Sequence, residues 1–260
     1  MHWRLEPCVL NLEPWNYMNA TKLYGLIGLP LTHSFSKNYF TQKFTTEGTA
    51  DTVYELFPLQ NIEMLPALLK AHPNLCGLNV TIPYKQQVLA YLDDVSALPL
   101  QACNCIKIVN GKLIGYNTDV AGFEQSFVEK LLPHQTKSLV LGTGGASVAV
   151  QYVLQKLHIA FKVVSRGNGA HLNYGQLDEA VMAEYLIIIN TTPLGTYPNV
   201  DDCPDIPYHL LTPQHYCYDL VYNPAITLFL QKALDNGAAI KNGSDMLKIQ
   251  ADVSWDIWNR

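Results

Sequence analysis

The chain has 260 residues, of which 48% are hydrophobic and 15% are charged, and its formal net charge is −5. This length is enough for one large or two ordinary domains, and the composition is that of a globular protein and not of a disordered one. The acidic balance and the lack of any run of Lys or Arg argue against a nucleic-acid partner.

The first half of the chain alternates between strand and helix patterns. Residues 1–20 show no periodicity, and we interpret them as an N-terminal extension. Short apolar runs predict three strands, over Leu23–Gly28, Val53–Phe57 and Leu78–Ile82. Apolar residues at helical spacing predict helices around Phe40 and Phe44, over 62–69 and over Gln86–Leu92. This alternation is typical of a parallel α/β sheet.

A second alternating series begins near Ser138. Apolar runs predict four strands, over Leu139–Leu141, Phe161–Val164, Leu186–Asn190 and Tyr218–Val221. The first of these strands is followed by a helix over Ala146–Leu157. Two α/β series predict two domains, and we expect a hinge between them within 117–122.

A glycine turn, G-T-G-G-A-S, joins the strand 139–141 to the helix that follows it. Gly142 allows the tight turn, Gly144 lets the backbone approach a pyrophosphate, and the N-terminus of the helix supplies N–H donors. The full fingerprint has glycine where this chain has Ser147, a small residue that still permits close packing. Methyltransferases and flavoproteins use similar turns, but the flanking strand and helix favour a dinucleotide site.

The end of the next strand indicates which dinucleotide binds. NAD enzymes usually place Asp or Glu there to hold the ribose 2′-hydroxyl. This chain has Ser165-Arg166-Gly167 instead, without a carboxylate. Arg166 can pair with a 2′-phosphate and stack on the adenine, which favours NADP. The alternative is a solvated surface arginine.

Four polar segments in the first half have residues that a packed α/β unit does not require: 33–36 (H-S-F-S), 79–85 (N-V-T-I-P-Y-K), 103–105 (C-N-C) and 117–119 (N-T-D). The first two follow predicted strands, and ligands of open α/β sheets bind beyond the carboxyl ends of the strands. Each segment also has a structural interpretation. Ser36 could cap a helix, Asn117 and Asp119 could form Asx turns, and Lys85 could be solvated.

From about Tyr24 to Trp258 the chain resembles the shikimate dehydrogenase family. Eight motifs in the same order carry this resemblance: G-x-P-x-x-H-S-x-S (28–36), N-V-T-x-P-x-K (79–85), the Asn104 turn, N-T-D-x-x-G (117–122), G-x-G-G-A-S (142–147), N-T-T-P-L-G (190–195), Y-D-L-x-Y-N-P (218–224) and N-G-x-x-M-L-x-x-Q-A (242–251). Together they are far more specific than the glycine turn alone.

The resemblance implies the NADPH-dependent, reversible reduction of 3-dehydroshikimate to shikimate, a step towards chorismate and the aromatic amino acids. It implies that Lys85 and Asp119 are catalytic. The substrate-binding residues that it implies are Ser34, Ser36, Asn79, Thr81, Asn104, Tyr222 and Gln250. The cofactor-binding residues that it implies are Gly142, Thr143, Gly144, Gly145, Ala146, Ser165, Arg166, Thr191, Thr192, Leu220 and Gly243.

The chemistry of these residue types fits that reaction. A cationic lysine can stabilise the alkoxide that develops on the reacting oxygen and can donate a proton to it, while an adjacent carboxylate orients the lysine. The hydroxyls of Ser34 and Ser36 suit a carboxylate, and neutral amide and hydroxyl groups suit a polyhydroxylated ring. Two domains around a cleft allow a closure that excludes water.

The implied fold is α/β. We expect a substrate-binding and catalytic domain over 21–119 and a Rossmann-like, doubly wound parallel-sheet NADP domain over 120–243. The resemblance implies that the last helix, within 244–260, returns to the substrate domain. One departure is Val148, where many relatives have an arginine, so that Arg166 alone carries the NADP preference.

Two other functions remain open from the sequence: a quinate/shikimate dehydrogenase that uses NAD, and a non-catalytic NADP-binding regulator. Lys85 and Asp119 argue against the regulator, because a sensor needs neither.

No apolar stretch could span a bilayer, and Glu6 and Glu13 interrupt the region where a signal peptide is apolar, so we expect a cytoplasmic protein. The six cysteines form no C-x-x-C pair, which predicts reduced thiols and no metal site. The expected partner is a small molecule, and the protein is expected to be a monomer or homodimer.

Overall fold

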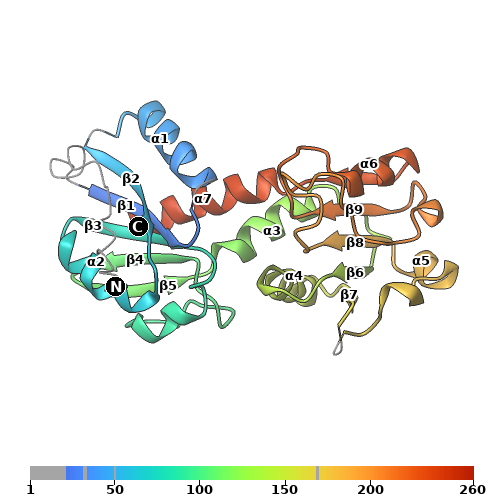
Figure 1. The fold of residues 1–260 in the computed structure, drawn as a ribbon, viewed down its shortest axis with the longest axis horizontal. Helices are drawn as coiled ribbons and strands as arrows, with labels where there is room; N and C mark the ends of the chain where they lie inside the picture. Colours follow the sequence, from blue (N-terminus) through green and yellow to red (C-terminus); the bar gives the residue numbers. More distant parts are fainter. Residues whose placement is uncertain (1–21, 32–33, 50, 168–169) are drawn as a thin grey trace, which may run out of the picture.

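The computed structural model describes residues 22–31, 34–49, 51–167 and 170–260. The predicted N-terminal extension and His33 of the H-S-x-S motif lie outside the described residues. The described chain forms two five-stranded sheets at opposite ends of an elongated molecule, and two helices run between them (Figure 1). The α/β fold and the division of the chain into two α/β series are therefore confirmed.

The first sheet has the strand order β2-β1-β3-β4-β5. Its strands are β1 (Lys22–Gly28), β2 (Thr52–Pro58), β3 (Leu75–Val80), β4 (Cys105–Val109) and β5 (Lys112–Tyr116). The first three are parallel, but β4 runs antiparallel to both β3 and β5. The predicted parallel arrangement is therefore confirmed for β1, β2 and β3, whereas the antiparallel strands β4 and β5 were not predicted. Asn110 and Gly111 both have positive φ and form the two-residue turn of a hairpin that the strand-helix pattern did not detect.

Helices cover the first sheet. They are α1 (Phe35–Glu47), the 3₁₀ turn η1 (Ile62–Met64), α2 (Leu65–Ala71) and the 3₁₀ helix η2 (Gln87–Tyr91). Phe40 and Phe44 are the buried face of α1, as their i,i+4 spacing predicts. The segment predicted as a helix at 86–92 is a 3₁₀ helix because its backbone bonds run from residue i+3 to residue i, as from Leu89 to Gln86.

The second sheet is entirely parallel and has the order β10-β9-β8-β6-β7. Its strands are β6 (Lys137–Leu141), β7 (Ala160–Val164), β8 (Ile187–Asn190), β9 (Tyr216–Asp219) and β10 (Ala239–Lys241). Its helical segments are α4 (Gly145–Lys156), η3 (Tyr174–Gln176), α5 (Glu179–Glu184), η4 (Tyr208–Leu210) and α6 (Leu228–Asp235). The order of the strands reverses at β6, so the crevice beside the carboxyl end of β6 is the topological switch point where doubly wound sheets bind ligands.

Two helices connect the sheets: α3 (Thr118–Val128) and α7 (Ser244–Asn259) pack side by side along the middle of the molecule (Figure 1). Gly122 permits this contact, because a Cβ atom there would lie 2.7 Å from the carbonyl oxygen of Met246. The far end of α7 reaches the first sheet, where Trp258 Nε1 donates to the carbonyl of Ile106 at 2.9 Å. The expected return of the last helix to the first sheet is therefore confirmed.

Candidate active site

A cavity of about 520 Å³ lies where the carboxyl end of the first sheet faces α7 and the loops that follow the strands of the second sheet. The predicted catalytic and substrate-binding residues all line it, together with some of the predicted cofactor-binding residues: Ser34, Ser36, Asn79, Thr81, Lys85, Asn104, Asp119, Ala146, Leu220, Tyr222, Gly243 and Gln250. The remaining wall is mostly apolar and includes Leu26, Phe35 and Met246, none of which was predicted as a site residue.

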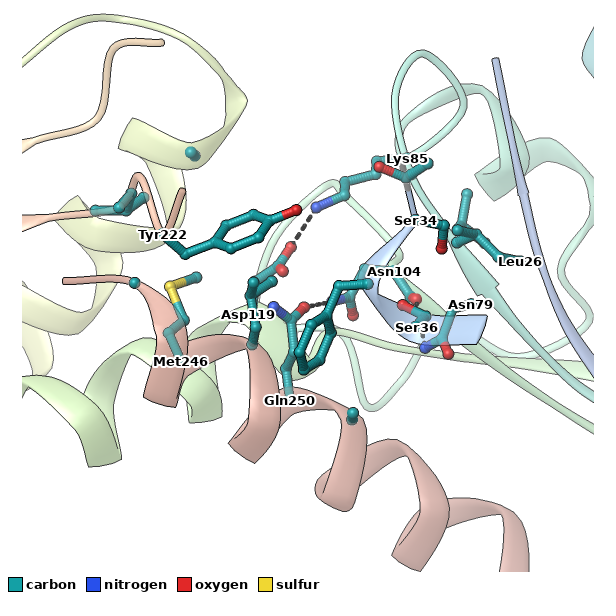
Figure 2. Close-up of a pocket in the computed structure, with 18 of the residues that line it drawn as sticks. Leu26, Ser34, Ser36, Asn79, Lys85, Asn104, Asp119, Tyr222, Met246 and Gln250 are labelled. Atoms are coloured by element: carbon teal, nitrogen blue, oxygen red, sulfur yellow. Dashed lines mark hydrogen bonds and ion pairs between the residues drawn. The ribbon is translucent and has the colours of Figure 1, made fainter. Parts of the chain in front are cut away.

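Lys85 and Asp119 form an ion pair inside this cavity, with Nζ 2.6 Å from Oδ2 (Figure 2). Lys85 comes from the turn after β3, and its carbonyl accepts a bond from the N–H of Cys103 at 2.7 Å. Asp119 lies in the first turn of α3, where the helix dipole favours a carboxylate. The side chains are 32% and 14% exposed, so the pair is partly desolvated but remains accessible to a ligand.

Asn79 is held from behind by two residues that sequence reasoning did not select. Its Oδ1 accepts from the Tyr54 hydroxyl at 2.9 Å, and its Nδ2 donates to Ser254 Oγ at 3.0 Å. Tyr54 is fully buried, and this burial raises its pKa well above the usual value, so the phenol stays a neutral donor. The signal that could have revealed Ser254 is a polar residue one helical turn after Gln250.

Asn104 is fixed in the same way. Its Oδ1 accepts from the backbone N–H of Thr118 at 2.6 Å, and its Nδ2 donates to Thr118 Oγ1 at 3.1 Å and to Gln250 Oε1 at 3.4 Å (Figure 2). Sequence reasoning missed Thr118 although it belongs to the N-T-D segment. The amides that the resemblance assigns to the substrate are thus oriented before any ligand binds, which lowers the cost of binding.

Ser34 has the only buried side-chain oxygen or nitrogen in the described part of the chain that lacks a hydrogen-bond partner. It occupies the N-cap position of α1 but makes no side-chain capping bond. Ser36 does not cap a helix either, because it lies inside the first turn of α1, where its hydroxyl interacts with Tyr54. Leaving a buried hydroxyl without a partner is costly, so the Ser34 hydroxyl is suited to a ligand group in the cavity.

Asn117, by contrast, has a structural role. It caps α3, with Oδ1 accepting from the N–H of Val120 at 3.3 Å, and its Nδ2 donates to the carbonyl of Ala102 at 2.9 Å.

Tyr222 is 38% exposed and reaches into the cavity from the loop after β9, with its hydroxyl directed towards Lys85 (Figure 2). That loop begins earlier than predicted, since β9 ends at Asp219 and not at Val221.

The glycine turn has the form that a pyrophosphate requires. Gly142 has φ 107°, a conformation that favours glycine, and Ser147 Oγ closes the turn by donating to its carbonyl at 2.8 Å. Gly144 occupies the N-cap position of α4, so no side chain satisfies the first N–H groups of the helix. Nothing lies within 4 Å of a Cβ atom added at Gly144 or Gly145. The exposed segment 143–146 therefore leaves the N–H groups at the start of α4 open to an anion.

The other predicted cofactor-binding residues surround this turn. The hydroxyls of Thr191 and Thr192 bond internally, to the carbonyl of Leu141 at 2.7 Å and to Asn190 Oδ1 at 2.6 Å, so they shape the wall beside Gly142. Ser165 and Arg166 follow β7, the neighbour of β6. Arg166 is exposed, and none of the ion pairs among the described residues includes it.

Within the described residues, no helix is long and apolar enough to cross a membrane, and no group of His, Cys, Asp and Glu could hold a metal ion. Val148 is 47% exposed on the first turns of α4, where it has no charge to offer a phosphate.

Comparison with known proteins places the chain in a family. The model of the shikimate dehydrogenase substrate binding domain matches residues 26–106. A shikimate dehydrogenase (NADP(+)) from Methanococcus maripaludis is 38% identical, over 92% of both chains. The solved shikimate 5-dehydrogenase from Thermus thermophilus, in complex with NADP(H) and shikimate, is 28% identical with a TM-score of 0.78, over 91% of this chain and 93% of that one. The quinate dehydrogenase from Corynebacterium glutamicum, in complex with NAD, is 25% identical with a TM-score of 0.79, over 91% and 93%. The chain belongs to the shikimate dehydrogenase family.

Proposed function

We propose that this chain catalyses the reversible reduction of 3-dehydroshikimate to shikimate with NADPH, and that Lys85 and Asp119 are its catalytic pair. The observation that carries this proposal is that the Lys85–Asp119 ion pair lines the same cavity as the unpartnered Ser34 hydroxyl. A carboxylate anchor at one side and a proton donor at the other are what a hydroxy acid with a remote carbonyl requires. The family, whose relatives are named for this activity, supplies the substrate class.

Lys85 supplies the charge and the proton. Its ammonium group stabilises negative charge on the substrate oxygen and donates a proton to it, and in the reverse direction its neutral amine accepts that proton. Asp119 holds the ammonium group in position through the 2.6 Å bond between Nζ and Oδ2. Tyr222 closes the cavity on the side of the second sheet, which limits access of water to the reacting oxygen.

The substrate is held by neutral groups. Ser34 and Ser36 donate to its carboxylate without adding a cation that would compete with Lys85. Asn79, Thr81, Asn104 and Gln250 bond to the ring hydroxyls, and the internal bonds of Asn79 and Asn104 hold these two amides in fixed orientations before the substrate arrives.

NADP, when bound, supplies the hydride of the reduction and accepts it in the reverse reaction. The open N–H groups of 143–146 suit its pyrophosphate, and Arg166 suits its 2′-phosphate, because Arg166 is exposed and unpaired by the described carboxylates. Leu220 and Gly243, which line the cavity next to Lys85 and Asp119, suit the redox-active end of the cofactor.

We further propose a substrate-binding and catalytic domain over 21–119, completed by 244–260, and a cofactor domain over 120–243. The separate buried cores of the two sheets support this division.

The described cysteines are free thiols, three of them buried, which fits the reducing environment of the cytoplasm. A monomer or homodimer is the expected state, and light scattering at several protein concentrations tests it.

Steady-state oxidation of shikimate with NADP⁺ tests the function, with quinate and NAD⁺ as the alternative substrate and cofactor. We expect the highest kcat/KM for shikimate with NADP⁺, and we expect Arg166→Ala to reduce the preference for NADP⁺ mainly through its KM. Lys162→Ala, which removes a cation from β7, the strand that precedes Arg166, is the control. Higher kcat/KM for quinate with NAD⁺ would favour the second candidate, and NADP⁺ binding without turnover would favour a regulator.

A further inference from the structure

Asp219 ends β9 just behind the cavity wall, and its carboxylate is fully buried. Oδ2 accepts from Thr227 Oγ1 at 2.5 Å, and Oδ1 accepts from Asn190 Nδ2 at 2.9 Å and from the backbone N–H of Val221 at 3.0 Å. No ion pair among the described residues includes Asp219. A buried carboxylate with neutral donors alone is costly, so its presence at this place requires a reason.

The bonds of Asp219 connect three separate elements at the carboxyl edge of the second sheet. Thr227 is the N-cap of α6, and its Oγ1 also accepts from the N–H of Leu230 at 3.3 Å. Asn190 ends β8, and its Oδ1 accepts from both the N–H and the hydroxyl of Thr192, at 3.0 and 2.6 Å. One carboxylate therefore joins the loops after β8 and β9 to the start of α6.

The segment that Asp219 holds most directly is 220–222, of which Leu220 and Tyr222 line the cavity. On one side, the N–H of Val221 donates to Asp219. On the other, the carbonyl of Val221 accepts from the N–H of Gly243 at 3.2 Å. Gly243 has no room for a Cβ atom, which would lie 2.2 Å from the Leu220 carbonyl oxygen. Leu220 and Tyr222 are thus held against the start of α7, and both line the cavity with Lys85 and Asp119. Figure 2 shows the Tyr222 hydroxyl directed towards that pair.

We propose that Asp219 is a positioning residue whose ionised carboxylate holds the Leu220–Tyr222 segment in its place opposite Lys85 and Asp119. This inference rests on the proposed function, because the location of the segment affects catalysis only if substrate and cofactor meet in this cavity. Hydrogen bonds to an ionised acceptor are shorter and roughly twice as strong as those to a neutral one. The charge therefore adds rigidity to a wall that must align two reactants, where small displacements have large effects on rate.

The protonation state of Asp219 then governs the wall. Burial raises the pKa of this carboxyl to about 6, and the bonds from Thr227, Val221 and Asn190 lower it in part. The titratable groups that interact with it electrostatically are Tyr208, Cys217 and Tyr218, and burial raises the pKa of each, so all three stay neutral. Once protonated, the carboxyl has an O–H donor of its own, and the bonds that it still accepts are weaker because the acceptor is neutral.

Asp219→Asn tests the role of the charge. An asparagine can keep Oδ1 as acceptor for Asn190 and Val221 while its Nδ2 donates to Thr227, which reproduces the protonated state at every pH. Asp235→Asn, an exposed residue at the other end of α6, is the matched control. Four measurements are made on each protein: amide hydrogen exchange of residues 220–222 without ligand, the NADPH dissociation constant by fluorescence, kcat with shikimate and NADP⁺, and the melting temperature.

At about pH 8 we expect Asp219→Asn to increase the exchange rate of the Val221 amide and to lower kcat by about tenfold, the effect of weakening one hydrogen bond to a charged group. The NADPH dissociation constant should change less than about threefold, because the open glycine turn is unaffected. At about pH 5, where wild-type Asp219 is protonated, the kcat ratio of wild type to variant should approach about one.

Two results would overturn the inference: a kcat ratio that is the same at both pH values, or a loss of activity that the fall in melting temperature fully explains without faster exchange at 220–222. Failure of the proposed function gives a different result, since the wild-type protein would then not oxidise shikimate at any pH. The exchange measurement on the ligand-free protein remains informative in that case.

Discussion

At the scale of single residues, the site combines the Lys85–Asp119 ion pair with neutral polar groups, and each buried side-chain oxygen or nitrogen except Ser34 Oγ has a hydrogen-bond partner among the described residues. Asn79 is held by Tyr54 and Ser254, and Lys85 is held by Asp119. Ser34 is the exception because its Oγ is buried without a partner among the described residues. We interpret this hydroxyl as reserved for the substrate, since folding alone does not satisfy it.

Lys85→Met should lower kcat for shikimate oxidation by roughly 10²–10⁴-fold, the usual contribution of a positioned proton donor or acceptor, with a smaller effect on KM. Lys112→Met removes an exposed lysine of β5 and should leave kcat unchanged. A near-normal kcat in Lys85→Met would remove this residue from the mechanism, and rapid kinetics with either variant would show whether hydride transfer is the affected step.

Replacing Ser34 and Ser36 together by alanine should weaken shikimate binding by roughly 2–4 kcal/mol, taking about 1–2 kcal/mol for each bond to a charged acceptor. The dissociation constant of NADP⁺ should hardly change. Thr46→Ala, which removes an exposed hydroxyl from the same helix, serves as control. Titration with both ligands and thermal melts distinguish the outcomes: a lower melting temperature with unaltered shikimate binding would make the serines structural.

At the scale of elements, the site depends on where helices and strands end. Asp119 is in the first turn of α3, Gln250 is in the middle of α7, and both face one cavity because α3 and α7 approach closely at Gly122. Only a residue without a side chain allows that approach, since a Cβ atom would lie 2.7 Å from a backbone oxygen of α7. The final glycine of the N-T-D-x-x-G motif therefore has a packing role.

Gly122→Ala should separate the two helices, destabilise the fold by about 1–3 kcal/mol, the usual cost of overpacking, and lower the affinity for shikimate. Urea denaturation and shikimate titration measure the two effects. Gln125→Ala changes an exposed residue of the same helix and should alter neither. If Gly122→Ala binds shikimate with wild-type affinity, the close approach of α3 and α7 does not set the geometry of Asp119 and Gln250.

At the scale of the whole molecule, a cavity shared by two sheets is built partly from groups that reduce stability. Asp219 is the clearest case, because burial raises its pKa from 3.8 to about 6. A carboxyl whose pKa is raised by folding favours the folded state fully below its unfolded pKa, and that contribution is lost as the pH rises through the folded pKa. The ionised form that we assign to the working enzyme is therefore the less stable one.

The free energy of unfolding of the wild-type protein, relative to that of Asp219→Asn, should consequently fall as the pH rises from about 4 to about 7. A shift of about two pKa units corresponds to roughly 3 kcal/mol across this window. Urea denaturation of both proteins at several pH values gives the difference directly, and other titrating groups cancel because the variant retains them. A difference that is constant with pH would mean that the pKa of Asp219 does not change on folding.

The sequence by itself was sufficient for the α/β fold, because apolar runs and helical spacing report burial locally, and for the glycine turn, whose conformation depends on the residues within it. The catalytic and substrate-binding residues that the motifs predict all line one cavity. The β4–β5 hairpin could have been predicted from Asn110-Gly111, which is a local signal.

Only the tertiary structure decided which residues support the site. Tyr54, Thr118 and Ser254 are far apart in the chain, and the sequence does not show which amide each of them orients. The same holds for Asp219, whose partners come from β8, α6 and the following loop. The physical reason is that hydrogen bonds and desolvation depend on distances in space, which are fixed only when α7 and the two sheets pack together.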